Sequence, residues 1–286
     1  MKKFFQTIFS MRNENTHKII TIMGLKIKFL RHKSNCSKLE KEIKEIKSVL
    51  EGINFAAQNN RADITAIKKM WDLPLKEKPW RNLKLSLAEV ASYQTAEFII
   101  KNMSTVKMLP KRLDLHTYAL SFAQKPGLYL EFGVYKGISI NHIAKQRPND
   151  KIYGFDSFEG LPEAWYGDYT KDRFKMENLP EVESNVELVI GYFNDTLPKF
   201  VQEHGEFDIA YLNIDCDLYS STKTIFDNLK SHISTGTVIF FDEYFNYPNW
   251  QQHEYKAFME FLEETGLQFE YLGYVYDREK VAVRII

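Results

Sequence analysis

From residue 128 to its end, the chain alternates short apolar segments with amphipathic ones, and this alternation most constrains the fold. The apolar segments predict strands, and the segments between them predict helices because their apolar residues recur at helical spacing. Strands that alternate with helices form mainly parallel sheets with helices on both faces. We expect strands at 128–132, 151–155, 186–190, 207–214, 237–241, 269–274 and 281–285, and helices at 87–103, 113–122, 138–146, 196–204, 221–231 and 253–265. Ser220 or Ser221 is the expected N-cap of the helix 221–231, and Gly266 is expected to end the last helix.

Composition excludes several classes of protein. The chain has 286 residues, with 38 Lys and Arg against 38 Asp and Glu, and 44% of its residues are hydrophobic. These values are typical of a globular protein, and a net charge of zero argues against a surface that binds nucleic acid. Cys36 and Cys216 are too few for a disulfide framework and fit no zinc site, so we expect a reducing, cytoplasmic location.

The zero net charge is a cancellation between two parts of the chain. Residues 1–50 hold twelve Lys or Arg and four Glu, a net charge of +8, which leaves −8 for the remainder. No secretory signal is visible, and the apolar stretch at 18–30 is shorter than the ~20 residues of a membrane helix. Its pattern predicts two short β segments around Gly24, a small hairpin within a basic segment 1–37. The alternative is a basic, apolar element that contacts an anionic surface such as the inner membrane, or glycan-assembly enzymes.

A heptad pattern follows the basic segment. Its a and d positions alternate by four and three residues over more than four heptads, which predicts a coiled coil over 38–73. We expect a homo-oligomer through residues 39–71; the alternative is a single amphipathic helix packed on the main domain. Pro74 and Pro79 mark a linker to that domain, at 80–286. The seam positions are Leu39, Ile43, Ile46, Leu50, Ile53, Ala57, Asn60, Ile64, Ile67 and Trp71.

A glycine turn follows the first strand of the main domain. Gly133 and Gly137 allow a tight turn and close approach of the backbone to a ligand. The turn departs from the dinucleotide fingerprint because Glu131 stands at the position of its first glycine. A carboxylate there would repel a pyrophosphate and suits a ligand with a positive charge. The turn therefore favours S-adenosylmethionine over NAD as the cofactor.

A second acid stands after the second strand. Asp156 lies 25 residues beyond Glu131, near the ~20-residue offset expected of an acid that holds a ribose diol. Phe158 is expected to stack on adenine. The alternative is that Asp156 only caps the loop that follows it.

Four more carboxylates follow the fourth and fifth strands: Asp215, Asp217, Asp242 and Glu243. The carboxyl ends of parallel strands meet at one edge of a sheet, so these groups would repel each other unless a cation joined them. Oxygen ligands suit Mg²⁺ or a similar divalent ion. The alternative is that most of these acids cap helices or lie on the surface.

Together these motifs resemble the macrocin O-methyltransferase family. The resemblance rests on Glu131–Ser139, Gly154–Pro162, Gly191–Pro198, Ile214–Thr222 and Phe241–Asn246, and it spans roughly residues 85–286 but not 1–80. It implies a class I, Rossmann-like, doubly wound α/β sheet with an antiparallel last strand, preceded here by the helical extension. It also implies metal-dependent transfer of a methyl group from S-adenosylmethionine to a sugar hydroxyl, in bacterial surface-glycan or other glycoside biosynthesis.

The resemblance assigns roles to individual residues. Asp215, Asp242 and Glu243 would hold Mg²⁺, with Glu243 where the family's best-known members have aspartate. Glu131, Ser139, Asp156 and Ser157 would line the cofactor site, and Asn194 or Asp195 would lie near the adenine.

The general base is left open among several residues. Asp215 is a candidate, as is Asp217 if it is not a metal ligand, and His253 and His142 are rivals. Aromatic residues in the long loops either face a sugar ring or pack on the sheet: Trp165, Tyr166, Tyr169, Tyr247 and Trp250. Two other functions remain, a non-catalytic scaffold of glycan assembly and a methyltransferase of catechol-like small molecules.

Overall fold

The computed structural model describes residues 82–165 and 170–286 with their side chains, and the backbone of three strands near the N-terminus. The chain divides into two units, 1–78 and 79–286, and each is described by itself. The predicted coiled coil at 38–73 lies outside the described residues.

The described strands of the first unit form a three-stranded antiparallel sheet in the order β1-β2-β3. The strands are β1 (Phe9–Glu14), β2 (His17–Ile22) and β3 (Leu25–Leu30). β2 and β3 stand on either side of Gly24, where the sequence predicts a hairpin, and Ile22 pairs with Leu25. β1 was not predicted, because its few apolar residues show no extended alternation.

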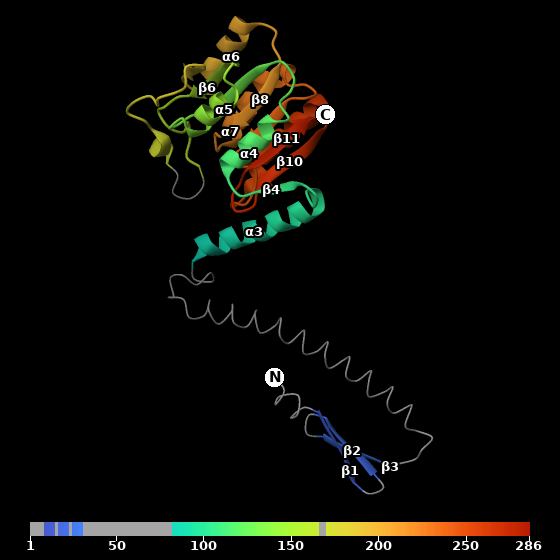
Figure 1. Ribbon diagram of the computed structural model, residues 1–286. Coiled ribbons are helices and arrows are strands. Elements are labelled where there is room, and N and C mark those ends of the chain that lie inside the picture. The colour runs from blue at the N-terminus through green and yellow to red at the C-terminus, as the bar shows by residue number, and fades with distance from the viewer. Residues whose placement is uncertain (1–8, 15–16, 23–24, 31–81, 166–169) are drawn as a thin grey trace. The chain divides into compact units, whose positions relative to one another are not determined.

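The second unit is built on an eight-stranded sheet in the order β4-β10-β11-β9-β8-β5-β6-β7 (Figure 1). β11 runs antiparallel to both of its neighbours, and the other pairs are parallel. The expected mainly parallel sheet with an antiparallel last strand is thus confirmed, while the edge strand β4 was missed because it is only three residues long. The strands are β4 (Lys107–Leu109), β5 (Leu128–Phe132), β6 (Ile152–Asp156), β7 (Val186–Ile190), β8 (Ile209–Ile214), β9 (Val238–Phe241), β10 (Phe269–Val275) and β11 (Val281–Ile285).

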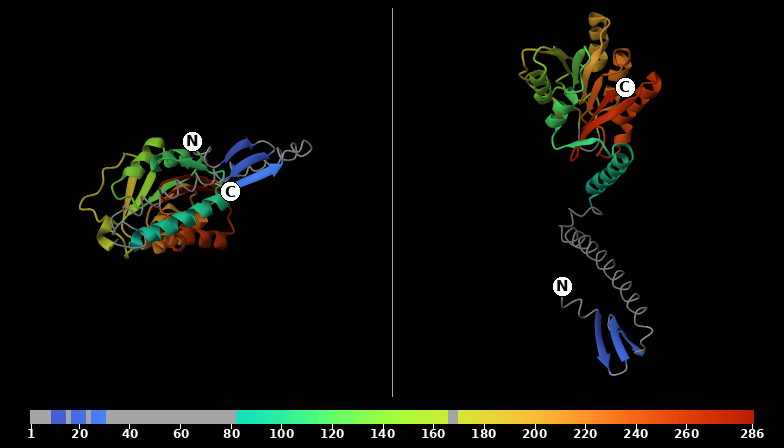
Figure 2. Two further views of the ribbon diagram at one scale, coloured as in Figure 1. Left: turned by 90° about the horizontal axis from the view of Figure 1, so that it is seen from below. Right: turned by 45° about the vertical axis from the view of Figure 1, so that its right-hand side comes forward.

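Helices cover both faces of this sheet (Figure 2). α4 and α5 pack on one face, and α6, α7 and α8 pack on the other. None of the helices in the described part of the chain is both long and apolar enough to cross a membrane. The helices are α3 (Leu83–Asn102), α4 (Arg112–Leu120), α5 (Ile138–Gln146), α6 (Phe193–His204), α7 (Tyr219–Leu229) and α8 (Glu254–Thr265), with short 3₁₀ turns η4 (Lys171–Phe174), η5 (Lys230–His232) and η6 (Trp250–Gln252).

The helix ends test the capping predictions. Gly266 ends α8 in the left-handed conformation with φ of 71°, as predicted. The predicted cap of α7 is wrong, because Leu218 is its N-cap and makes no side-chain cap hydrogen bond. Ser220 and Ser221 lie within the first turn of α7, so their side chains stand beyond the capping position.

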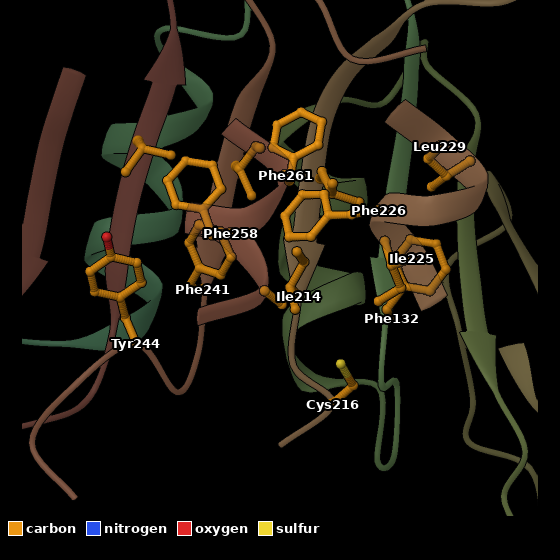
Figure 3. Packing of buried hydrophobic residues seen from close by; sticks show 14 of the residues in the cluster. Phe132, Ile214, Cys216, Ile225, Phe226, Leu229, Phe241, Tyr244, Phe258 and Phe261 are labelled. Carbon is orange, nitrogen blue, oxygen red and sulfur yellow. The ribbon is translucent and has the colours of Figure 1, made fainter. Parts of the chain in front are cut away.

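Burial on both faces explains why the central strands are continuous apolar runs in the sequence. Every residue of β8 is buried, because helices cover it on both sides. Figure 3 shows the side of the sheet that α7 and α8 cover, where the rings of Phe226 and Phe261 stack with centroids 4.6 Å apart and Phe258 packs on Phe241. Burial of each such ring contributes about 1.5–3 kcal/mol.

The strand order reverses between β5 and β8. The chain continues from β5 through β6 to β7, then returns to the other side of β5 to form β8. Ligands of such sheets bind outside the carboxyl ends of the strands at this switch point. Gly133 stands there with φ of +94°, and a Cβ at this residue would lie 1.7 Å from the carbonyl oxygen of Asp215. The turns after β5 and β8 therefore pack backbone against backbone.

We expect Gly133→Ala to destabilise the fold far more than Gly266→Ala, although both residues have positive φ. Nothing lies within 4 Å of a Cβ at Gly266, so that variant carries only the backbone cost of about 1 kcal/mol. Gly133→Ala adds a clash with the Asp215 carbonyl and should cost ~2 kcal/mol or more beyond the control. Urea denaturation of both variants measures the difference. Equal losses would contradict the close packing of the two turns.

Candidate active site

A cavity of about 460 Å³ opens at the carboxyl ends of β5, β6, β8 and β9. It lies at the switch point where the sequence pattern placed the ligand. Nine of the predicted site residues line it: Gly133, Ser139, Asp156, Ser157, Asn194, Asp215, Asp217, Asp242 and Glu243.

Glu131 does not line the cavity, because its side chain is completely buried beneath it. Ser139 Oγ donates to Glu131 Oε1 at 3.0 Å, and Asn213 Nδ2 donates to Oε2 at 2.8 Å. Burial raises the pKa of Glu131 to about 8, against the lowering effect of Arg112 and of these two hydrogen bonds. The structure therefore places Glu131 behind Ser139 as its support.

Four other predicted residues also lie off the cavity wall. Gly137 has φ of 75° and caps the N-terminus of α5. Phe158 is 5% exposed and belongs to the core cluster on the α4 and α5 face, so the structure does not bring its ring to the cavity. Asp195 lies in the first turn of α6, where its carboxylate accepts from Asn194 Nδ2 at 3.2 Å. His253 packs beside the rings of Trp165 and Tyr247, and burial lowers its pKa.

The loop aromatics mostly pack into the core. Tyr247 and Trp250 are buried, and Trp165 packs against the same core cluster. These three side chains and His142 are absent from the cavity wall, and Tyr166 and Tyr169 lie outside the described residues. Other aromatic and apolar side chains line the cavity instead, together with hydroxyls from α7: Tyr135, Ile138, Leu161, Phe174, Tyr192, Phe193, Ser220, Ser221 and Thr224.

Asp156 organises the turn after the neighbouring strand. Its Oδ2 accepts from the backbone N–H groups of Val134 at 2.9 Å and Tyr135 at 2.8 Å. Its Oδ1 accepts from Phe158 N at 2.7 Å, which is the loop-capping role held open as the alternative. Asp156 also faces the cavity, so one carboxylate fixes the glycine turn and borders the ligand site.

The acids of β8 and β9 converge in one cluster. Asp215, Asp242 and Glu243 each contribute an oxygen, and these atoms lie within 4.8 Å of one another. Hydrogen bonds past the strand ends produce this arrangement: Asp215 N donates to Phe132 O and Asp242 N donates to Ile214 O, both at 2.9 Å. The three acids are called the acidic cluster below. Asp217 is buried beside it, with φ of 63°.

Two basic side chains that the sequence pattern missed neutralise the acidic cluster. Arg112 pairs with Asp215 through Nη2, and its Nε lies 2.8 Å from Asp242 Oδ1. Lys280 Nζ lies 3.0 Å from Asp242 Oδ2 and donates to the Asp242 carbonyl at 3.2 Å. Arg112 follows β4, the short edge strand that the sequence analysis missed, and Lys280 precedes β11 instead of following a strand, so the strand-end pattern gave no signal for either. The overall excess of acids at the strand ends was the one hint that cations must be nearby.

The pKa values of the acids at the site shift in different directions, lower for Asp242 and higher for the others. Burial alone would raise the pKa of Asp242, but Arg112 and Lys280 lower it to about 2. Burial raises the pKa of Asp215 to about 6, with Arg112 opposing the rise and Asp242 adding to it. Burial and the neighbouring acids hold the pKa values of Asp217 and Glu243 well above their usual range. The site therefore favours whatever adds positive charge or a proton to it.

The donor set fits a divalent ion. Glu243 is 8% exposed, and its Oε2 is a buried atom with no hydrogen-bond partner among the described residues. The three cluster oxygens are of the type that Mg²⁺ prefers, and the open cavity leaves room for oxygens of water or substrate. The glutamate at position 243 brings its oxygen into the cluster despite its extra methylene.

Comparison with known proteins finds similarity to methyltransferases. A family model described as "Methyltransferase domain" matches residues 130–244. A tetracenomycin-related rhamnosyl 4'-O-methyltransferase of Streptomyces olivaceus is 26% identical over 161 residues, covering 47% of this chain and 60% of that protein. Demethyldecarbamoylnovobiocin O-methyltransferase of Streptomyces niveus is 27% identical over 169 residues, covering 49% of this chain and 62% of that protein. The chain thus spans about three fifths of the length of each relative.

Solved structures were compared as well. The calicheamicin methyltransferase CalS11 has a TM-score of 0.47 and 21% identity, covering 74% of this chain and 96% of that one. The O-methyltransferase NovP has a TM-score of 0.46 and 23% identity, covering 60% of this chain and 78% of that one. The family model spans most of β5 through β9, so the part of the chain that forms the mainly parallel sheet and the cavity at its switch point is similar to a methyltransferase domain.

Proposed function

We propose that this protein is a metal-dependent O-methyltransferase that transfers a methyl group from S-adenosylmethionine to a hydroxyl of a sugar or glycan. The observation that carries the proposal is one cavity that joins the glycine turn after β5, the carboxylate of Asp156 and the acidic cluster. A cofactor end and an acceptor end therefore meet within a single space.

The cofactor end is the region around Gly133, Ser139 and Asp156. S-adenosylmethionine supplies an electrophilic methyl group on a positively charged sulfur. Asp156 fixes the turn through Val134 and Tyr135, so the backbone there is preorganised to receive the ligand. Its cavity-facing carboxylate is placed to accept from ribose hydroxyls, as its spacing from Glu131 predicts.

The acceptor end is the acidic cluster. A divalent ion held by Asp215, Asp242 and Glu243 would supply Lewis acidity and a template for the acceptor hydroxyls. Backbone hydrogen bonds from Asp215 N to Phe132 O and from Asp242 N to Ile214 O fix the main chain that carries two of these three acids. Lys280, anchored on Asp242, orients that carboxylate from behind.

Asp217 is the general base in this proposal. It lines the cavity beside the cluster, while His253 and His142 do not. Burial and the neighbouring Asp215 and Asp242 raise its pKa, so its carboxylate, once deprotonated, is a stronger proton acceptor than that of an exposed aspartate. A base beside the acceptor hydroxyl removes its proton as the oxygen attacks the methyl carbon.

A sugar acceptor is supported by the names of two relatives, which concern a rhamnosyl group and novobiocin. Aromatic walls and serine and threonine hydroxyls suit a sugar ring, and the cavity offers both. We place the acceptor in a surface glycan or another glycoside.

The basic N-terminal segment, with its net charge of +8, supports a site of action near anionic surfaces or glycan-assembly enzymes. The heptad segment 39–71 supports a homo-oligomer.

Removal of divalent ions should abolish methyl transfer. We expect EDTA to lower kcat by about 100-fold or more, because a Lewis acid contributes several kcal/mol to such steps, and added Mg²⁺ to restore it. The assay follows methyl transfer to a panel of glycosides, sugar nucleotides and catechols at saturating S-adenosylmethionine. EDTA already saturated with Mg²⁺ is the control. Full activity in free EDTA would exclude the metal, and turnover of catechols alone would exclude the sugar acceptor.

Asp217→Asn should remove the base and leave cofactor binding intact. Asparagine keeps the shape of the side chain and tolerates the positive φ at this position. We expect kcat to fall by about 10²- to 10⁴-fold, the usual contribution of a general base, with little change in the Kd of S-adenosylhomocysteine. Asp195→Asn, on a residue that does not line the cavity, is the matched control. Near-normal kcat in Asp217→Asn would assign the base to another residue.

A further inference from the structure

Arg112 occupies the cation position of the acidic cluster. Its guanidinium bridges two cluster members from different strands, with Nη2 on Asp215 and Nε 2.8 Å from Asp242 Oδ1. A divalent ion bound to the same oxygens needs those lone pairs. The guanidinium and the ion therefore cannot hold Asp215 and Asp242 in the same way at the same time.

Of the two basic side chains at the cluster, Arg112 is the one that can leave. Its side chain is 29% exposed and lines the cavity, whereas that of Lys280 is 11% exposed and does not. Lys280 is also held by the Asp242 carbonyl and by Glu279 at 3.1 Å, contacts that do not depend on cluster oxygens. Lys280 is thus a fixed counter-ion and Arg112 an exchangeable one.

The place to which Arg112 can turn is also visible. Its Nη2, which pairs with Asp215, already lies 3.3 Å from the Oγ of Ser139, a residue in the first turn of α5 just beyond the glycine turn. Glu131, the acid nearest to that side, already accepts from Ser139 and Asn213. A guanidinium released there is partly desolvated and gains most from a new anion in the cavity.

The cofactor carries one anion, the carboxylate of its methionyl group. The sulfur carries the ribose, the methyl group and the methionyl chain as three separate substituents. With the ribose at Asp156 and the methyl group directed to the acidic cluster, the methionyl chain would extend along the remaining wall of the cavity, which includes Gly133 and Ser139. These are the residues beside which Arg112 stands. The cavity wall holds one other basic side chain, Lys136, among the described residues.

We propose that Arg112 exchanges between two anions: it pairs with Asp215 and Asp242 when no divalent ion is bound, and with the cofactor carboxylate when the ion has displaced it. The inference rests on the proposed function, and it makes Arg112 a cofactor-binding residue that couples ion and cofactor binding. The ion frees the guanidinium for the cofactor, so each ligand strengthens the binding of the other.

The coupling is measured on the full chain by calorimetry, without turnover. For the wild-type protein we expect S-adenosylhomocysteine to bind about fivefold or more tightly with saturating Mg²⁺ than in EDTA, the lower range of such coupling. The decarboxylated analogue S-adenosyl-3-thiopropylamine, which lacks the carboxylate, should bind equally in both conditions. This comparison needs no variant and so does not depend on a variant's folding.

Variants then assign the coupling to Arg112. Arg112→Gln should bind Mn²⁺ several-fold more tightly, because the competing cation is gone, and should bind S-adenosylhomocysteine weakly and independently of the ion. Lys136→Gln removes the other basic charge of the wall, contacts no cluster member, and should keep the coupling. Arg112→Lys, which retains a charge but cannot bridge both aspartates, should show reduced coupling. Thermal denaturation verifies that each variant is folded.

The possible outcomes separate the proposed role of Arg112 from the proposed methyltransferase function. S-adenosylhomocysteine that binds the wild-type protein equally with and without Mg²⁺ overturns the exchange and leaves the methyltransferase function standing. Coupling that persists in folded Arg112→Gln, or that extends to the decarboxylated analogue, overturns the role of Arg112. Failure of the wild-type protein to bind S-adenosylhomocysteine at all overturns both.

Discussion

Repulsion among carboxylates gathered at one edge of the sheet is the constraint on which the rest of the site depends. Parallel strands bring Asp215, Asp242 and Glu243 within 4.8 Å of one another in a largely buried place. Such a cluster persists only with cations or protons beside it. Arg112 and Lys280 supply the cations. The raised pKa values of Asp217 and Glu243 mean that burial and the neighbouring acids favour the protonated form of both side chains. The site is built to receive positive charge.

The same constraint links the two halves of the cavity. Gly133 packs against the Asp215 carbonyl, and Asp156 holds the turn that contains Gly133's neighbours Val134 and Tyr135. The turn that carries Asp215 is therefore in direct backbone contact with the turn that we assign to the cofactor. Arg112 adds a second link, because it contacts both the cluster and Ser139. The proposed ion and cofactor sites would share both backbone contacts and a side chain, so we expect the binding of one ligand to depend on the other.

Much of the fold could be predicted because its periodicity is local. The strands of the main sheet other than β4 were placed to within about two residues, since a strand buried on both faces reads as a short apolar run. Predictions of where a single side chain points were less accurate, because they depend on neighbours that are distant in the sequence. Phe158 was predicted to stack on adenine, yet its side chain packs into the core cluster on the α4 and α5 face. Glu131 looked like a ligand of the cofactor, yet Ser139 and Asn213 enclose it.

The sequence by itself determined the alternation of strands and helices and the acids at the carboxyl ends of β5, β6, β8 and β9, because both are encoded within a few residues of each strand. It thereby placed nine residues of the cavity wall. Only the tertiary structure decided which cations neutralise those acids. Arg112 lies 103 residues from Asp215, and Lys280 lies 38 residues from Asp242, so no spacing along the chain reports either pair. Which basic side chains reach the cluster depends on where α4 packs on the sheet and where the turn before β11 lies, and both are properties of the folded chain as a whole.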